Sequence, residues 1–236
     1  NVDLLALFVE NVLSATFAAT VFDNPNLSPS KMAEIFGNNY LSSTKATEIF
    51  NQMTRATDDI ALTFNNTSFP VSKIAYILEN TTKSIDEIAT ILNSGSLSTE
   101  RVASILNNSN LSADRVALIA DSPSITSARL KSILDTGVFT DYDKIAAILD
   151  GNSLAVDDAV SHIESCIYSD DVYVSALASD YLSISRFEAI VENPNLTTAK
   201  LVSLIDTAYS ASNVSFMNKL IVVERADRGK YVGGDY

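Results

Sequence analysis

Residues 97–107 read LSTERVASILN, and residues 111–121 read LSADRVALIAD. The two segments are one pattern repeated after fourteen residues, and a fixed short period is the signature of a repeat architecture. Stepping along the chain by fourteen residues, with slips of one residue after Leu130, finds a residue at the centre of each copy: Ala18, Met32, Ala46, Ile60, Ile74, Ile88, Val102, Val116, Leu130, Ile145, Val160, Val174, Phe187 and Leu201. The chain therefore contains fourteen copies between about Leu13 and Asp206.

Each copy carries the start and stop signals of a short helix. Most copies begin with a side chain that accepts a hydrogen bond from a first-turn amide: Ser14, Ser28, Ser42, Ser84, Ser98, Ser112, Thr126, Asp141, Asp170, Ser183 and Thr197. Ala56 and Pro70 stand at this position in two copies, so we expect shifted helix starts there. Most copies end at Asn, Asp or Gly, and Gly and Asn tolerate the left-handed conformation that terminates helices.

The remaining positions of the repeat describe one buried helix face. Apolar residues three and four positions after the centre, such as Ile105 and Leu106, fall on the side of the helix that carries the centre. A helix of about ten residues is marginal alone and gains stability by stacking on its neighbours. We therefore predict an all-α fold, an α-solenoid or superhelix of about fourteen 14-residue single-helix repeats, whose helices alternate in direction in two layers.

The same pattern divides the chain into four segments. Residues 1–12 are expected to form an N-terminal cap helix, and residues 13–206 the repeat array. Residues 207–225 contain an offset apolar pattern that predicts a C-terminal cap helix, and the Gly-containing residues 226–236 predict a tail.

Composition and charge exclude several classes of protein. The 236 residues include one histidine and one cysteine, so neither a Cys/His zinc site nor a disulfide within the chain is expected. No glycine-rich phosphate-binding motif occurs, and we expect no cofactor, no metal, no small-molecule substrate and no catalytic residues. His162 is expected to be a core histidine and Cys166 a small buried residue. The sequence therefore predicts a protein that is not an enzyme.

Basic residues recur at one position of the repeat, directly before the centre. This ladder consists of Lys31, Lys45, Lys73, Arg101, Arg115, Arg129, Lys144, Arg186 and Lys200. A row of cations could follow a phosphate backbone, as helical-repeat nucleic-acid binders do. Alternatively, it could join successive repeats by pairing with helix-ending acids and free carbonyls. The net charge of −13 favours the second interpretation, because nucleic-acid binding needs a surplus of Lys and Arg.

The segment Leu111–Ala120 resembles the first helix of a TAL-effector DNA-binding repeat. That family alternates two unlike helices over a longer period and reads bases with a residue pair on the loop between them. In this chain every helix is of one kind, and the loops, such as 107–110 and 121–124, vary without a code. The shared residues serve capping and packing, so they assign no family.

These observations favour a structural or interaction protein that docks a protein partner or assembles head to tail with further copies of itself. Nucleic-acid binding through the Lys/Arg ladder is the alternative. The apolar first 22 residues contain Glu10, Asn11 and several hydroxyl side chains, which disfavours a membrane span. The compartment is unknown. Abundant Ser, Thr and Asn weakly favour an extracellular or virion-like surface, as do eight Asn-x-Ser/Thr sites, at Asn26, Asn65, Asn66, Asn80, Asn107, Asn110, Asn195 and Asn213.

Overall fold

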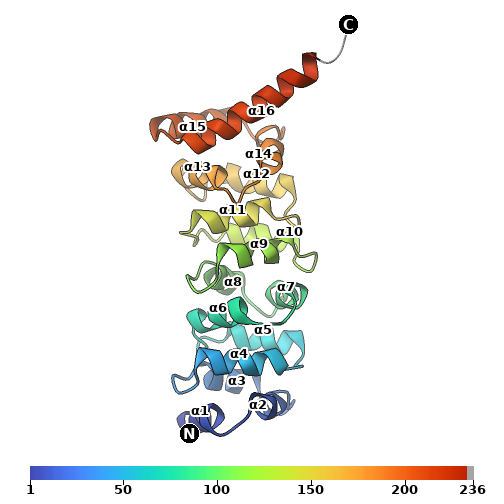
Figure 1. Ribbon diagram of the computed structural model, residues 1–236, viewed down its shortest axis with the longest axis vertical. Coiled ribbons are helices and arrows are strands. Elements are labelled where there is room, and N and C mark those ends of the chain that lie inside the picture. The colour runs from blue at the N-terminus through green and yellow to red at the C-terminus, as the bar shows by residue number, and fades with distance from the viewer. Residues whose placement is uncertain (233–236) are drawn as a thin grey trace.

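The protein is an all-helical rod in a computed structural model that describes residues 1–232, with side chains to residue 224 (Figure 1). No strand occurs within the described residues. The sixteen helices are α1 (Val2–Asn11), α2 (Ala15–Phe22), α3 (Pro29–Gly37), α4 (Ser43–Gln52), α5 (Thr57–Asn65), α6 (Val71–Asn80), α7 (Ile85–Asn93), α8 (Thr99–Leu106), α9 (Ala113–Asp121), α10 (Ser127–Leu134), α11 (Tyr142–Asp150), α12 (Val156–Glu164), α13 (Asp170–Ala178), α14 (Ile184–Val191), α15 (Thr198–Ser210) and α16 (Val214–Val232).

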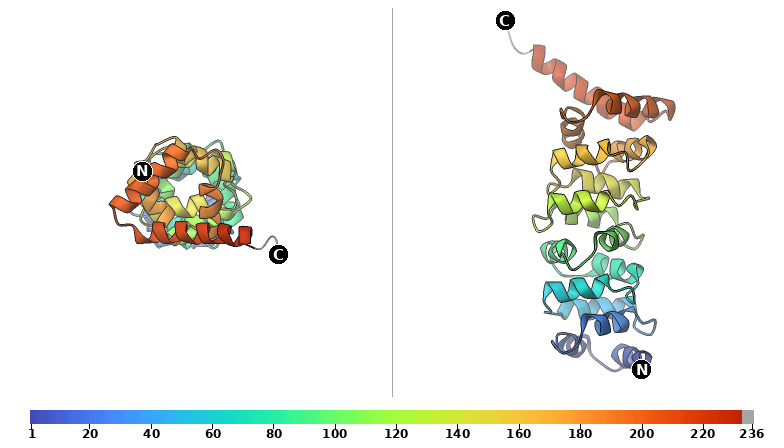
Figure 2. Two further views of the ribbon diagram at one scale, coloured as in Figure 1. Left: turned by 90° about the horizontal axis from the view of Figure 1, so that it is seen from above. Right: turned by 180° about the vertical axis from the view of Figure 1, so that it is seen from behind.

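The helices stack in sequence order, as a helical-repeat solenoid requires. Each helix packs chiefly on the second helix along the chain, for example α2 on α4, α4 on α6, and α9 on α11. Two stacks of helices result, joined by short loops, and the termini lie at opposite ends of the rod (Figures 1 and 2). The predicted fold class is confirmed.

The predicted caps start most of the helices. The hydroxyl groups of Ser28, Ser98 and Ser112 each accept a hydrogen bond from the amide three residues further on, and Ser84 forms a complete capping box with Glu87. The helices after Ala56 and Pro70 begin in phase without a side-chain cap, so the expectation of shifted starts is wrong. In α13 the N-cap is Ser169, one residue before the predicted Asp170.

The helix ends differ from the prediction. Within residues 1–232, positive φ angles occur only at Gly137, Cys166 and Ser212, so Asn and Gly at the ends are generally not left-handed. Gly37 is needed for another reason: a Cβ atom there would lie 1.8 Å from the Ser68 carbonyl oxygen. The main chain at the end of α3 therefore lies in direct contact with the main chain of the loop between α5 and α6.

The two ends of the rod extend the repeat. In α1 the pattern continues with a step of thirteen residues: Leu5 is the centre, and Ala6 is buried like the Ala residues after other centres. Helix α15 runs to Ser210, and α16 spans Val214–Val232 instead of the predicted 207–225. The segment expected as a tail is thus helical through Val232, and residues 233–236 lie outside the described residues.

Candidate functional site

Six of the nine basic side chains of the ladder bind main-chain carbonyls of the loop that begins three helices earlier. Arg101, in the first turn of α8, donates from Nε to the Phe64 carbonyl (2.8 Å) and from Nη2 to the Asn66 carbonyl (3.1 Å). A further bond from Nη2 reaches the carbonyl of Phe69. This one guanidinium thus binds the end of α5 and two carbonyls of the loop from α5 to α6.

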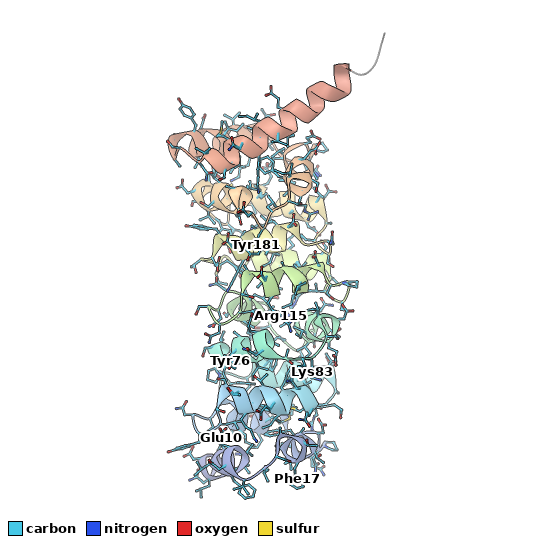
Figure 3. The ribbon with its side chains drawn as sticks, viewed as in Figure 1. Glu10, Phe17, Tyr76, Lys83, Arg115 and Tyr181 are labelled. Carbon is cyan, nitrogen blue, oxygen red and sulfur yellow. The ribbon has the colours of Figure 1, made fainter. Side chains whose placement is uncertain are left out.

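The same contact recurs along the rod. Arg129 binds the carbonyls of Leu92 (3.0 Å) and Leu97 (2.5 Å). Four more ladder residues make one or more equivalent bonds to the loop beneath them: Lys73, Arg115, Lys144 and Arg186. Figure 3 shows Arg115 midway along the rod. We call each such cation–loop contact a rung.

Three ladder residues are placed differently. Lys31 lies on α3, which has no loop three helices earlier within the described residues, and it pairs instead with Glu34 at 2.7 Å. Lys45 lies 4.0 Å from Glu48. Lys200 pairs with Asp170 at 2.6 Å and lies over the ring of Tyr173.

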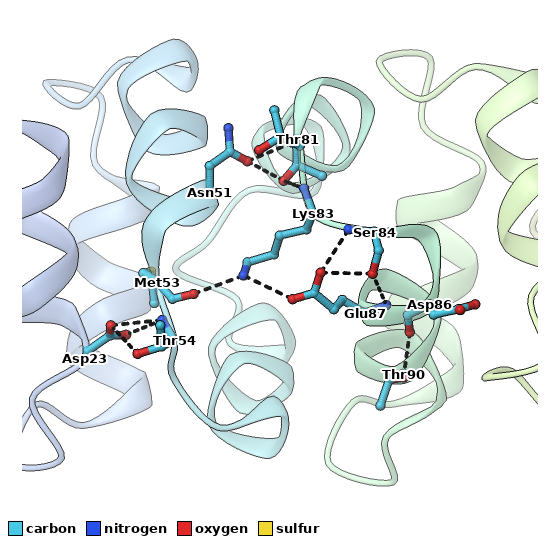
Figure 4. A network of polar contacts seen from close by, with 11 residues as sticks. Asp23, Asn51, Met53, Thr54, Thr81, Lys83, Ser84, Asp86, Glu87 and Thr90 are labelled. Atoms are coloured by element: carbon cyan, nitrogen blue, oxygen red, sulfur yellow. Dashed lines mark hydrogen bonds and ion pairs between the residues drawn. The ribbon is translucent and has the colours of Figure 1, made fainter.

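Three further cations form rungs that the sequence pattern did not identify. Arg55 and Lys83 stand directly before the N-cap of α5 and α7, whose ladder position is acidic, Asp59 and Glu87 respectively. Lys83 Nζ donates to the Met53 carbonyl (3.0 Å) and lies 3.6 Å from Glu87 (Figure 4). Arg55 pairs with Asp59 at 2.7 Å. A basic residue four positions before an acid is the signal that could have located both.

Arg55 and the third of these cations reach several carbonyls each. Arg55 binds the loop from α2 to α3 through the carbonyls of Phe22, Asn24 and Leu27. Lys219 of α16 donates to three carbonyls of the α13–α14 segment, those of Leu177, Ser179 and Leu182. Lys219 lies three residues after the ladder position of α16, which counted from the capping residue Asn213 is Phe216, so the repeat pattern did not identify it.

A second set of contacts runs alongside the rungs. Helix-ending Asp, Glu or Asn side chains accept hydrogen bonds from main-chain amides at the start of the third helix further on. Glu79, for example, accepts from the Ser112 amide at 2.9 Å. Corresponding acceptor–donor pairs are Glu10–Ser42, Asp23–Thr54, Asn51–Thr82, Asn65–Ser98, Asn93–Thr126, Asn107–Thr140, Asp121–Asn152, Asp150–Ser183 and Glu164–Thr197. These acids therefore bind amides rather than the ladder cations.

We call the place where a helix meets the loop that begins three helices earlier a joint. In the described part of the chain several joints have no cationic rung, and one of them is the joint of α13 with the loop from α10 to α11. Tyr168 donates through its hydroxyl to the Leu134 carbonyl (3.4 Å) and accepts from the Phe139 amide (3.2 Å). Tyr173, which counted from the N-cap Ser169 is the centre of α13 and not its ladder residue, donates to the His162 carbonyl (3.0 Å). An aromatic cluster thus replaces the guanidinium at this position.

His162 is the core histidine expected from the sequence, and it belongs to this joint. Its ring is fully buried, and Nδ1 lies 2.7 Å from an Asp135 carboxylate oxygen. Nε2 has no hydrogen-bond partner within the described residues. Burial lowers the pKa of His162 below its usual value, against the opposing effect of Asp135. Cys166 is exposed, with φ of +55°, so its predicted burial is wrong.

Burial also affects the ladder cations. It lowers the pKa of the guanidinium groups of Arg101, Arg115, Arg129 and Arg186. It lowers the pKa of Lys73 to about 8, although Glu10 acts in the opposite direction. Desolvated cations of this kind are directed toward the protein main chain, which leaves little of their charge to face a ligand.

No group of three or more His, Cys, Asp or Glu side chains within the described residues is placed to hold a metal ion. No helix in the described part of the chain combines the length and the apolar character needed to cross a bilayer. Comparisons of the chain with protein-family models, with curated proteins and with solved structures gave no match, so functional inference depends on the geometry of the repeat array.

Proposed function

We propose that the chain is a non-enzymatic scaffold that acts through protein–protein contacts, with a protein partner or with further copies of itself. The observation that carries this proposal is the use of the ladder. Cations such as Arg101 and Arg129 hold one turn of the rod on the next by binding loop carbonyls. The repeated polar residues therefore serve the stiffness of an extended body, which suits a scaffold.

The nucleic-acid alternative requires the same cations to face solvent as a continuous row. Phosphate contacts need exposed Lys and Arg and give binding that weakens steeply with salt. Arg101 and Arg186 are instead half-buried against carbonyls, and the chain carries 29 acidic against 16 basic residues. These features support a protein partner over a nucleic acid.

A binding titration separates the two functions. Labelled single-stranded and double-stranded oligonucleotides are titrated with the full chain at low ionic strength and then at physiological ionic strength. The scaffold proposal predicts no salt-dependent binding. A dissociation constant in the micromolar range that weakens with salt, and that Lys31→Glu weakens further, would favour the alternative.

The scaffold itself is tested by chemical cross-linking in extracts of the source organism. Cross-linked peptides identified by mass spectrometry should map reproducibly to one or two surface regions of the rod, and a charge substitution within such a region should abolish them. Cross-links scattered over the whole surface at the frequency of any abundant protein would contradict a docking role.

A further inference from the structure

A groove on the side of the rod lies at the joint of α7, whose ladder position is acidic. It is bounded by the end of α4, the start of α5 and part of α7, and its volume is about 460 Å³. Ligand sites in proteins measure roughly 300–1,000 Å³. The ladder residue Glu87 bonds back to Ser84 in the capping box, so it does not cover the loop beneath it as Arg101 does at the joint of α8. Space that a ladder cation covers elsewhere is therefore open here.

The floor of the groove is apolar and opens toward the core. It consists of Met53, Ile60 and Ile91. Met53 and Ile60 also border a cavity inside the rod, lined mostly by apolar side chains, whose free space of about 10 Å³ is enough for one water-sized group. Ile60 is 5% exposed, whereas the other centres from α3 to α11 are 0–1% exposed. An apolar group that enters between Met53 and Ile60 would therefore pass from water into the core.

A cation lies beside this opening. The Lys83 ammonium donates a hydrogen bond to the Met53 carbonyl at 3.0 Å, and an ammonium has three donors. Its distance of 3.6 Å from Glu87 is too long for a hydrogen bond (Figure 4). Arg55 is a second cation in the lining, where Glu87 is the one acid. The groove is thus locally cationic on a chain of net charge −13, and it favours an anion.

The cation and the apolar opening are adjacent, which restricts the ligand. Met53 supplies both the carbonyl that binds Lys83 and a side chain of the opening. A ligand that uses both must therefore carry its anionic group and its apolar group within one residue of each other. The last residue of a protein meets this requirement when it is aliphatic, because its carboxylate and its side chain are bonded to the same carbon atom. The amide side chains of Asn51 and Gln52, also in the lining, can bond the peptide groups that precede it.

We propose that this groove binds the carboxyl terminus of a protein partner whose last residue is aliphatic. The terminal carboxylate pairs with Lys83, and the side chain enters between Met53 and Ile60. Capture of a terminal carboxylate is a recurring mode of peptide recognition, and charge-assisted hydrogen bonds give it strength. The inference rests on the proposed scaffold function and specifies the chemistry of the partner.

Nuclear magnetic resonance of the full chain, isotope-labelled at its methionine methyl groups, tests this site. Met32 and Met53 border the inner cavity, and Met217, the third methionine, lies on α16 and serves as the reference. The probe is the peptide acetyl-Gly-Gly-Leu with a free carboxylate, which should shift the signals of Met53 and Met32 saturably and leave that of Met217 unchanged. The same peptide with a carboxamide terminus, or with alanine in place of leucine, should bind about 10-fold or more weakly.

Two variants at the groove should change the affinity in opposite directions. Glu87→Gln removes the carboxylate that competes for Lys83 and keeps a side chain that can complete a capping box, so it should tighten binding about 3-fold or more. Lys83→Gln should weaken binding about 10-fold or more. Glu100→Gln changes an exposed acid in the first turn of α8, and as the matched control it should leave the affinity unchanged. Circular dichroism verifies that each variant is folded.

Three results would overturn this site. The first is an unchanged Met53 signal at saturating leucine peptide, and the second is equal affinity for the carboxylate and carboxamide peptides. The third is tight binding of isocaproate, which has the carboxylate and side chain of leucine without any peptide group: an affinity equal to that of the peptide would assign the groove to a small molecule. All three leave the scaffold function to be decided by the cross-linking experiment.

Discussion

Two joints of the rod perform the same task with different chemistry. Where α10 meets the loop from α7 to α8, the guanidinium of Arg129 binds the carbonyls of Leu92 and Leu97. Where α13 meets the loop from α10 to α11, the hydroxyl of Tyr168 binds the Leu134 carbonyl instead. At both joints a side-chain donor thus binds the loop carbonyls, and this donor can be charged or neutral.

The difference has consequences for strength and for pH dependence. A guanidinium has several donors in a fixed geometry and stays protonated at any physiological pH. The aromatic joint has fewer donors and includes a buried, titratable histidine whose Nε2 is unpaired within the described residues. We therefore expect the cationic joint to contribute more stability and the aromatic joint to lose stability on acidification.

The largest expected effect is at the cationic joint. Arg129→Met removes the bonds to Leu92 and Leu97 and leaves their carbonyls buried, which should lower the free energy of unfolding by about 3 kcal/mol. Urea denaturation followed by circular dichroism measures this loss. Arg129→Lys keeps a cation that reaches fewer carbonyls and should lose roughly half as much. A loss below about 1 kcal/mol in the Met variant would mean that water replaces the rung.

A smaller effect is expected when the neutral donor is removed. Tyr168→Phe deletes the hydroxyl that bonds the Leu134 carbonyl and the Phe139 amide, and should cost about 1–2 kcal/mol in the same denaturation experiment. Tyr209→Phe, at an exposed position of α15, is the control and should change nothing measurable. A Tyr168→Phe loss equal to that of Arg129→Met would remove the distinction between the joints.

Acidification should weaken the aromatic joint selectively. The pKa of His162 is lowered in the folded chain, chiefly by burial, so the unfolded chain binds the proton first. Stability is therefore complete above a pH of about 6.5 and declines as the pH falls toward the folded pKa, by at most about 1.4 kcal/mol per pH unit. Hydrogen exchange should show faster opening of α13 than of α8, which carries the Arg101 rung, near pH 5.5 relative to pH 7.5.

His162→Gln tests whether this residue is the source of the effect. The variant should abolish the difference between α13 and α8 in their response to pH, even if it lowers stability overall. An unchanged difference would assign the pH dependence to other groups, such as Asp135, whose pKa is also lowered through its bonds to Lys131 and His162 despite the opposing effect of burial.

The smallest effect is expected at a ladder residue without a loop beneath it. Lys31 occupies the position of Arg129 but pairs with Glu34, and its side chain is 43% exposed. Lys31→Met should therefore change the free energy of unfolding by less than about 0.5 kcal/mol, as for other exposed ion pairs. A loss approaching that of Arg129→Met would show that the repeat position itself, rather than the loop contact, carries the energy.

Local signals predicted most of the fold. The spacing of Val102, Ile105 and Leu106 set the buried helix face, and hydroxyl residues such as Ser98 set the helix starts. Both signals come from residues of a single helix and its cap, so a single sequence was enough to recognise them. The continuation of the pattern into α1 was missed because its step is thirteen residues rather than fourteen.

The contacts between turns could be predicted only in part. The fixed position of Arg101 and its equivalents indicated a row of cations, but the loop each one binds lies more than thirty residues earlier in the chain. The repeat pattern did not identify Arg55 and Lys83, because they reach the same kind of loop from outside the ladder position. The exposure of the Cys166 side chain depends on how the chain packs in three dimensions, which no local sequence pattern predicts.

The rungs bind peptide groups, so they do not read the identity of the residues that supply those groups. Exposed loop side chains such as Thr67, beside the bonded carbonyl of Asn66, are consequently free to diverge while the loops keep their places. Mutations that would ruin a core are tolerated at these sites, and each turn displays them at a regular interval along the outside. The architecture therefore separates what must be preserved from what selection can vary, and new binding specificities can evolve on its loops at little risk to folding.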